Sequence, residues 1–450
     1  MKRSSLIGHI IELHDAICSS KLPADIIIKE FFKSRHYLGA KDRRFISEVV
    51  YGLVRNYKLI QAYAAESART IGVVTFPRNV PSILLIGVYF ARIMKESPDA
   101  MLPDISGLWR VYLPEIDCRR FLESATSALL PAAIENDPLK SIATRFSMPE
   151  VIVREWIERY GNAEAESLCA SLNSPAPITI RVNTLATTVA QCRATLKDEG
   201  IEPEPTTLSP FGLKLEKRVN TQALASFKRG YFEMQDEGSQ LLSMLVGAVP
   251  GATIVDACAG GGGKTLHLGA LMNNMGTLIA IDVDKRRLDN IRERVRRAGV
   301  SIADILLADR DQDAIHNWTG KANAVLIDAP CTGVGTFRRN PGAKLTFTDD
   351  FVDAVAKTQR EVLERYSPLV KPGGRLVYST CTLLKKENED QVSWFLSEHH
   401  DFELVSAPEM LTEQGIRVES GTPFLSLLPH RTTTDGFFAA VMVRREFVDS

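Results

Sequence analysis

A glycine-rich segment at residues 256–265 reads Asp256-Ala257-Cys258-Ala259-Gly260-Gly261-Gly262-Gly263-Lys264-Thr265. It follows a short apolar run at 253–257, which is typical of a buried strand, and it leads into a helical pattern at 264–272. Glycines at a strand end let the backbone pass close to a ligand and leave free amides at the start of the next helix. We therefore interpret this segment as the ligand-binding turn of a β–α unit.

From this turn to the end of the chain, strand and helix patterns alternate. Strands are predicted at 253–257, 277–283, 304–308, 324–328 and 375–379, with helices between them at 264–272, 285–298 and 350–369. Two further apolar segments, 424–428 and 437–444, are expected to form antiparallel edge strands. The alternation predicts an α/β fold with a doubly wound, Rossmann-like sheet over residues 251–450.

Upstream of the α/β region, the patterns indicate two further domains, and 450 residues are enough for roughly three. Residues 1–145 read as all-helical, because apolar residues recur at helical spacing, for example over 42–56 and 83–94. Residues 146–250 read as a small α+β unit, with helices at 150–160, 163–172 and 189–199 and strands at 175–183, 213–215 and 230–234. We expect this unit to pack against the α/β domain.

Bulk composition excludes several classes of protein. The chain is 45% hydrophobic and 24% charged with a net charge of −1, which is ordinary for a globular protein. No apolar run approaches the roughly 18 residues that a membrane span needs, and the N-terminus lacks the apolar core of a signal peptide. The seven cysteines include no C-x-x-C pair, so we expect neither a zinc site nor a disulfide framework. A reducing cytoplasm fits this cysteine usage.

Three ligand-binding motifs compete for the glycine-rich turn. A phosphate-binding P-loop needs G-x-x-x-x-G-K-[ST], but Cys258 occupies the position of its first glycine. The dinucleotide fingerprint G-x-G-x-x-G would begin at Gly260 and end on Thr265, which is not a glycine. An S-adenosylmethionine site needs only the glycine-rich turn and an acidic residue after the second strand. The third motif fits best.

Acidic residues end three successive predicted strands. They are Asp256, Asp282 and Asp309. Each of them alone is explained as a helix N-cap. Together they favour ligand binding, because the carboxyl ends of parallel strands form the edge at which such sheets bind ligands.

The next two strands end in cysteines. The fourth leads into Asp328-Ala329-Pro330-Cys331 and the fifth into Ser379-Thr380-Cys381. A free cysteine is most often a small buried apolar residue, and we keep that interpretation for the side chain of Cys258. For Cys331 and Cys381, a position at the crevice beside Asp328 favours a chemical role.

These segments resemble the motifs of the RsmB/Sun-like RNA 5-methylcytosine methyltransferases. Residues 256–265 resemble D-x-C-A-A-P-G-G-K-T, residues 328–341 resemble D-A-P-C-S-G-x-G-x-x-R-R-N-P, and residues 379–389 resemble S-T-C-[ST]-x(4)-E-N-E. Shorter matches are R-V-N at 181–183, Q-D-x-x-S at 235–239 and D-G-F-F at 435–438, and the helical region resembles a NusB-like domain. One departure is Gly260-Gly261 in place of Ala-Pro, which should make the empty turn more flexible and puts cofactor affinity in doubt.

The resemblance implies a role for each site residue. Cys381 would attack carbon 6 of a cytosine, Asp328 would hold the base, and Cys331 would assist release of the covalent adduct. S-adenosylmethionine would be held by Cys258, Ala259, Gly260, Gly261, Gly262, Gly263, Lys264, Asp282, Asp309 and Asp328. No metal is implied.

The substrate implied by the resemblance is RNA. A NusB-like domain points to 16S ribosomal RNA, with transfer RNA as the alternative, and a monomer without membrane association is expected. A P-loop ATPase and a non-catalytic RNA-binding protein are the competing function classes. The basic run at 285–297 carries seven basic and two acidic residues, and with Arg338, Arg339, Lys385 and Lys386 it offers phosphate contacts. Its alternative explanation is a solvated helix face.

Overall fold

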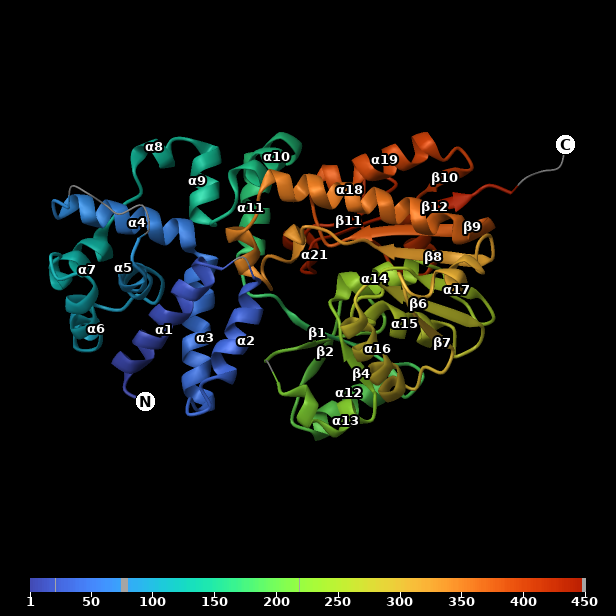
Figure 1. Cartoon of the computed structure of the whole chain (residues 1–450), viewed down its shortest axis with the longest axis horizontal. Coiled ribbons are helices and arrows are strands. Elements are labelled where there is room, and N and C mark those ends of the chain that lie inside the picture. Colours follow the sequence, from blue (N-terminus) through green and yellow to red (C-terminus); the bar gives the residue numbers. More distant parts are fainter. Residues whose placement is uncertain (21, 74–79, 218, 447–450) are drawn as a thin grey trace. The chain divides into compact units, whose positions relative to one another are not determined.

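The computed structural model describes residues 1–20, 22–73, 80–217 and 219–446. The chain forms two compact units, Met1–Pro175 with Phe337–Thr348, and Ala176–Thr336 with Asp349–Ser450 (Figure 1). The domain boundaries expected near residues 145 and 250 stay predictions. In the described ranges, no helix has both the length and the apolar character needed to cross a membrane.

The first unit is helical, as its apolar spacing predicted. Its helices are α1 (Arg3–Cys18), α2 (Ala24–Lys33), α3 (Ala40–Arg55), α4 (Tyr57–Thr70), α5 (Ser82–Val88), α6 (Pro98–Tyr112), α7 (Cys118–Ser127), α8 (Ala132–Glu135), α9 (Pro138–Arg145), α10 (Glu150–Tyr160) and α11 (Asn162–Leu172). Helices α3, α10 and α11 confirm the predicted ones. The helix expected over 83–94 changes after α5 into a π-helical turn, Tyr89–Ile93. The buried stripes of α1, α3, α5, α6 and α7 form one core.

The short segment 337–348 belongs to this helical unit. It contains a 3₁₀ turn, Pro341–Leu345, whose Lys344 ammonium donates to the Phe146 carbonyl at 3.1 Å and to Asn173 Oδ1 at 2.6 Å. Burial lowers the pKa of Lys344 to about 7. Arg338 is only 4% exposed, so its side chain is not open to a phosphate and that expectation is wrong, whereas Arg339 is exposed.

The second unit begins with a small antiparallel sheet in the order β2-β3-β1-β4. Its strands are β1 (Ile178–Val182), β2 (Pro203–Pro205), β3 (Gly212–Leu215) and β4 (Phe232–Met234), and α12 (Val189–Asp198) and α13 (Ala225–Lys228) accompany them. Strand β2 was not predicted. It starts and ends with proline, which a strand tolerates at a sheet edge, where β2 lies.

The large sheet has the order β10-β12-β9-β8-β5-β6-β7, with β11 paired to β12. Its strands are β5 (Thr253–Asp256), β6 (Thr277–Asp282), β7 (Ala303–Leu307), β8 (Ala322–Asp328), β9 (Val370–Thr380), β10 (Phe402–Val405), β11 (Leu425–Leu427) and β12 (Phe437–Arg444). Strands β5 to β9 are parallel, and β10, β11 and β12 pair antiparallel. The doubly wound fold is confirmed. Strand β12 was expected at the edge but lies inside the sheet, because β10, which was not predicted, pairs with its outer side.

Helices cover both faces of this sheet (Figure 1). They are α14 (Glu237–Leu245), α15 (Gly263–Leu271), α16 (Lys285–Ala298), α17 (Gln312–His316), α18 (Asp349–Tyr366), α19 (Glu389–Glu398), α20 (Ala407–Glu413) and α21 (Pro429–Thr432). Successive residues of a strand point to opposite faces of the sheet and enter different hydrophobic cores. Ile254 packs with α14 and α15, whereas Val255 packs with α18 and α19. Such burial on both faces fixes the carboxyl ends of β5, β6, β8 and β9 at one edge.

Candidate active site

The turn after β5 is shaped by two glycines and one carboxylate. Gly260 and Gly262 have φ values of +55° and +79°, a region in which residues with a side chain are rare. Asp282, at the end of β6, accepts hydrogen bonds from the Gly260 amide and the Asp284 amide, each at 2.8 Å. A carboxylate has about four acceptor sites, so two bonds leave Asp282 able to accept two more. The turn is therefore closed by the acid that was predicted to face a ligand.

Asp256 lies under the turn and is fully buried. Its Oδ2 accepts from the Thr265 hydroxyl at 2.6 Å, while its Oδ1 has no hydrogen-bond partner in the described part of the chain. Burial raises the pKa of this carboxyl to about 7, although the Thr265 hydrogen bond and the charge of Lys264 oppose the rise. An orphaned carboxylate oxygen at this place favours a cationic or hydrogen-donating ligand.

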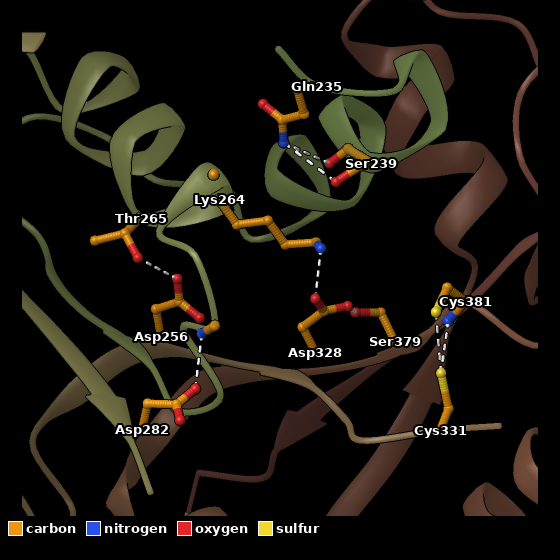
Figure 2. Close-up of polar contacts among 12 residues, drawn as sticks. Gln235, Ser239, Asp256, Lys264, Thr265, Asp282, Asp328, Cys331, Ser379 and Cys381 are labelled. Carbon is orange, nitrogen blue, oxygen red and sulfur yellow. Dashed lines mark hydrogen bonds and ion pairs between the residues drawn. The ribbon is translucent and has the colours of Figure 1, made fainter. Parts of the chain in front are cut away.

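Lys264 and Asp328 form an ion pair in the centre of the site. Figure 2 shows the lysine reaching from the start of α15 to the aspartate at the end of β8, with Nζ–Oδ2 at 2.6 Å. Asp328 Oδ1 accepts from the Ser379 hydroxyl of β9 at 3.2 Å. Burial acts to lower the pKa of Lys264, but Asp328, Asp256 and Cys381 outweigh it and raise that pKa. Lys264 thus remains an ammonium next to three groups that carry or can acquire negative charge.

The two predicted cysteines meet beside this ion pair. Cys331 follows β8 and Cys381 follows β9, and their Sγ atoms lie 3.1 Å apart (Figure 2). The Cys381 amide also donates to Cys331 Sγ at 3.3 Å. The contact with Cys381, burial and the nearby Glu387 carboxylate raise the pKa of Cys331 well above its ordinary value. One thiol of the pair is therefore held protonated.

Three residues that were predicted to hold the cofactor differ in how exposed they are. Ala259 is buried, and Cys258 is half-buried beneath the turn, where burial raises the pKa of its thiol far above the ordinary range. The Asp309 side chain is 75% exposed, with Oδ1 at 3.5 Å from Arg365 Nη1. Its contact with a cofactor stays a prediction.

Two upstream motifs brace the same turn from the small sheet. The Arg181 guanidinium, on β1, donates to Gln235 Oε1 at 2.6 Å and to the Gly263 carbonyl at 2.7 Å. Gln235 in turn donates to Ser239 Oγ at 3.2 Å (Figure 2). Burial lowers the pKa of Arg181 to about 9. The R-V-N and Q-D-x-x-S motifs therefore support the start of α15 from outside the large sheet.

The basic helix α16 divides into internal and exposed cations. Arg294 and Arg297 both bind Glu233, which is 3% exposed, so they are engaged inside the protein. Lys285, Arg286 and Arg296 are exposed on the same helix. Only the exposed cations of this run are thus available to phosphates, and not the whole run as the sequence suggested.

Glu387 and Gln359 were missed as site residues. Both are buried at 0% exposure and hydrogen-bond to the cysteine turns. Gln359 had a detectable signal, because it is a polar residue in the buried stripe of α18, between Ala356 and Leu363. Glu387 had been noted only as part of a motif.

Comparisons with known proteins agree on one family. A family model described as 16S rRNA methyltransferase RsmB/F matches residues 243–443, and a model for the ferredoxin-like domain of RsmF/B-like methyltransferases matches residues 148–222. A Bacillus subtilis protein named "Probable ribosomal RNA small subunit methyltransferase B" is 30% identical over 99% of this chain and 100% of its own length.

Solved structures are similar over comparable lengths. The crystal structure of PH0851 is 28% identical and superposes with a TM-score of 0.75, covering 98% of this chain and 99% of that one. A methyltransferase homologue from Pyrococcus horikoshii is 26% identical with a TM-score of 0.57, covering 70% of this chain and 100% of its own.

Proposed function

The chain belongs to the 16S rRNA methyltransferase RsmB/F family, and from this premise we propose that it methylates carbon 5 of a cytosine in small-subunit ribosomal RNA. S-adenosylmethionine is the methyl donor, and Cys381 is the nucleophile. The observation that carries the proposal is the pair of thiols 3.1 Å apart at the ends of neighbouring strands, beside the Lys264–Asp328 ion pair. A methyltransferase acting on oxygen or on an exocyclic nitrogen has no use for two thiols at this place.

The chemistry explains why the site contains a nucleophile. Carbon 5 of cytosine is a weak nucleophile, and a thiolate that adds to carbon 6 makes carbon 5 enamine-like and able to accept a methyl group. Lys264 places a positive charge beside the reacting groups, and Asp328 accepts a hydrogen bond from the exocyclic amine and shares a proton with ring nitrogen 3, which stabilises the charge that develops there on addition. After methylation a base takes the proton from carbon 5, the bonding electrons re-form the double bond between carbons 5 and 6, and the bond from carbon 6 to Cys381 breaks with Cys381 leaving as the thiolate. Cys331 assists this release.

The residues of the turn fit S-adenosylmethionine. The ligand would supply an electrophilic methyl group on a cationic sulfonium. The orphaned Oδ1 of Asp256 suits a donor such as the ammonium of its amino-acid part, and the two free acceptor sites of Asp282 suit ribose hydroxyls. Residues Cys258 to Lys264 would surround the ligand, and Gly260-Gly261 closes the turn without the Ala-Pro of the family motif.

The need for Cys381 to reach carbon 6 also favours a target cytosine in an RNA loop or in an opened helix. A cytosine stacked in a duplex cannot present carbon 6 to Cys381, so the target must be unstacked. The exposed cations of α16 supply phosphate contacts without sequence readout.

The test separates adduct formation from release. Purified Cys381→Ala should transfer no methyl group to 16S RNA from a deletion strain, while Cys331→Ala should accumulate a covalent protein–RNA complex that survives denaturing electrophoresis. Bisulfite sequencing of total RNA from the deletion strain locates the target cytosine. Full transfer by Cys381→Ala would overturn the mechanism, and loss of a transfer-RNA site alone would overturn the proposed substrate.

A further inference from the structure

The two cysteine turns run side by side in matched register. Cys331 and Cys381 approach to 3.1 Å between their sulfur atoms, and the residues that follow them, Thr332 and Thr382, approach to 3.1 Å between their hydroxyl oxygens. The turns come from different strands and have no covalent link near this point. The pairing of β8 with β9 ends at Asp328 and Ser379, so beyond that point further contacts must keep the two turns at this separation.

The carboxylate of Glu387 contacts both turns. Its Oε2 accepts from the Thr332 amide at 2.8 Å, and its Oε1 accepts from the Thr332 hydroxyl at 2.5 Å and from the Thr382 hydroxyl at 2.9 Å. Gln359 donates a fourth hydrogen bond to Oε2 at 3.1 Å. Four donors fill the acceptor capacity of a carboxylate, and hydrogen bonds to a buried charge are stronger than neutral ones.

The position of Glu387 is itself fixed from several sides. The Tyr378 hydroxyl, on β9, donates to the Glu387 carbonyl at 2.7 Å. The next residue, Asn388, donates to the Thr382 carbonyl at 3.1 Å and accepts from the Thr380 hydroxyl at 2.6 Å. Gln359 also donates to the Pro330 carbonyl at 2.9 Å, just before Cys331. Glu387 is therefore the central member of a rigid, buried network around both cysteines.

We propose that Glu387 is a positioning residue for the methyl transfer: its carboxylate joins the two cysteine turns so that both thiols face the same cytosine. The inference rests on the proposed function and adds a residue that touches neither base nor cofactor. Nucleophile and release thiol must act on one base in succession, and a displacement of about 1 Å can cost roughly 100-fold in rate.

The charge of Glu387 has a second consequence. It is one of the groups that raise the pKa of Cys331, after the contact with Cys381 and burial. Burial also raises the pKa of Glu387 itself, although its hydrogen bonds oppose this. Removing the charge should lower the pKa of Cys331, a change that loss of packing alone would not produce.

Two substitutions separate geometry from charge. Glu387→Ala removes every contact. Glu387→Gln keeps an acceptor for the Thr332 amide and Gln359, and its amide can donate to the two threonine hydroxyls, which can reverse because they both donate and accept. Glu398→Gln, which removes an exposed carboxylate at the far end of α19, is the matched control.

Covalent adduct formation with 16S RNA should fall about 100-fold in Glu387→Ala and recover to within about threefold in Glu387→Gln and Glu398→Gln. A second measurement needs no RNA. Diamide should join Cys331 to Cys381 as a disulfide about tenfold more slowly in Glu387→Ala than in the wild type, as quantified by peptide mass spectrometry. In a Cys381→Ala background, the pH profile of Cys331 alkylation should move down by about one unit on Glu387→Gln.

Equal adduct and disulfide rates in Glu387→Ala and wild type would overturn the proposal, as would an unshifted alkylation profile. If Glu387→Ala does not fold, Thr382→Val removes one of the clamped hydroxyls and should slow disulfide formation about threefold; no effect there would overturn it equally. If the wild type forms no Cys381-dependent adduct, the proposed function fails, while the disulfide and alkylation measurements still decide whether Glu387 positions the thiols.

Discussion

Gly335 lies where three backbone segments of the active site meet. Its amide donates to the Cys381 carbonyl at 3.0 Å, and its carbonyl accepts from the Gly436 amide at 2.8 Å. A Cβ atom here would lie 2.2 Å from the Gly436 oxygen and 2.8 Å from the Cys381 oxygen, and neither backbone group can rotate away. The position of the Cys381 turn thus depends on the absence of a side chain at Gly335, 46 residues earlier in the chain.

Gly335→Ala should therefore displace the Cys381 turn. We expect a loss of about 2 kcal/mol in the free energy of unfolding, because the overpacked atoms are backbone. We also expect at least a tenfold slower RNA adduct formation. Urea unfolding and the adduct assay measure the two effects. Gly421→Ala is the control, since a Cβ there meets nothing within 4 Å. If Gly335→Ala has the stability and adduct rate of the wild type, the backbone contacts of Gly335 do not constrain the position of Cys381.

Lys264 forms an ion pair with Asp328 beside the two thiols. Lys264→Met keeps the side-chain volume but leaves Asp328 without its counter-charge, and it removes a cation from the place where charge develops during addition to the base. Adduct formation should fall about 100-fold, the order of loss when one charge-stabilising donor is removed from an active site. The exposed Lys357 provides the control substitution, Lys357→Met. Wild-type adduct formation by Lys264→Met would contradict the electrostatic role.

At the scale of elements, helix α16 carries cations of two kinds. Arg294 and Arg297 hold the buried Glu233, whereas Arg286 and Arg296 are exposed without an internal partner in the described residues. Each phosphate contact contributes about 0.7 to 0.9 to the slope of log affinity against log salt. Arg286→Gln with Arg296→Gln should therefore flatten that slope by about 1.5 while leaving protein stability unchanged.

Filter binding at salt concentrations from about 50 to about 200 mM measures the salt dependence of RNA binding and checks this prediction. A control double variant, Arg417→Gln with Lys357→Gln, removes two exposed cations elsewhere in the same unit. If the slope of log affinity against log salt is the same in both double variants, the exposed cations of α16 form a solvated helix face, which is the alternative explanation of this basic run.

Periodicity predicted most elements of the large sheet because buried parallel strands and amphipathic helices have local signatures. Edge strands β2 and β10 escaped it, since a short strand is defined by its partner rather than by its own pattern. The same limit applied at the site. Strand-end positions predicted that Asp282, Asp328, Cys331 and Cys381 gather at one edge. The Glu387 network joins residues from three separate segments, so the pattern around any one of them could not reveal it.

At the scale of the whole chain, each compact unit contains a buried neutral histidine. His14 belongs to the helical unit and contacts Ser82 Oγ at 2.7 Å, and burial lowers its pKa to about 4, although Asp15 opposes this. His267 belongs to the second unit, where burial lowers its pKa well below the ordinary value. In that unit Asp256 acts in the opposite direction, because a raised carboxyl pKa makes the folded state bind a proton first as pH falls.

The helical unit gives the clearer test. In the unfolded chain His14 binds a proton near pH 6.5, whereas in the folded unit it does so only near pH 4. The contribution of neutral His14 to stability is therefore complete above pH 6.5 and is lost as pH falls from 6.5 to about 4. The loss should reach about 3 kcal/mol. Lys344 has a separate window: the unfolded chain takes up its proton near the ordinary pKa of 10.5 and the folded unit only near 7, so stability is lost as pH falls between these two values. Acid should therefore weaken this unit in two separate steps.

His14→Gln should remove the lower step, because glutamine can still bond to Ser82 but does not titrate. Urea unfolding at pH 7.5, 6.5, 5.5 and 4.5, or roughly those points, followed by hydrogen exchange of amides in α1 and α5, reports on the helical unit specifically. The exposed His36 supplies the control, since His36→Gln should leave the pH dependence unchanged. If His14→Gln loses stability between pH 6.5 and 4.5 as steeply as the wild type, then the acid sensitivity of this unit originates in other groups and His14 is accommodated in its charged form.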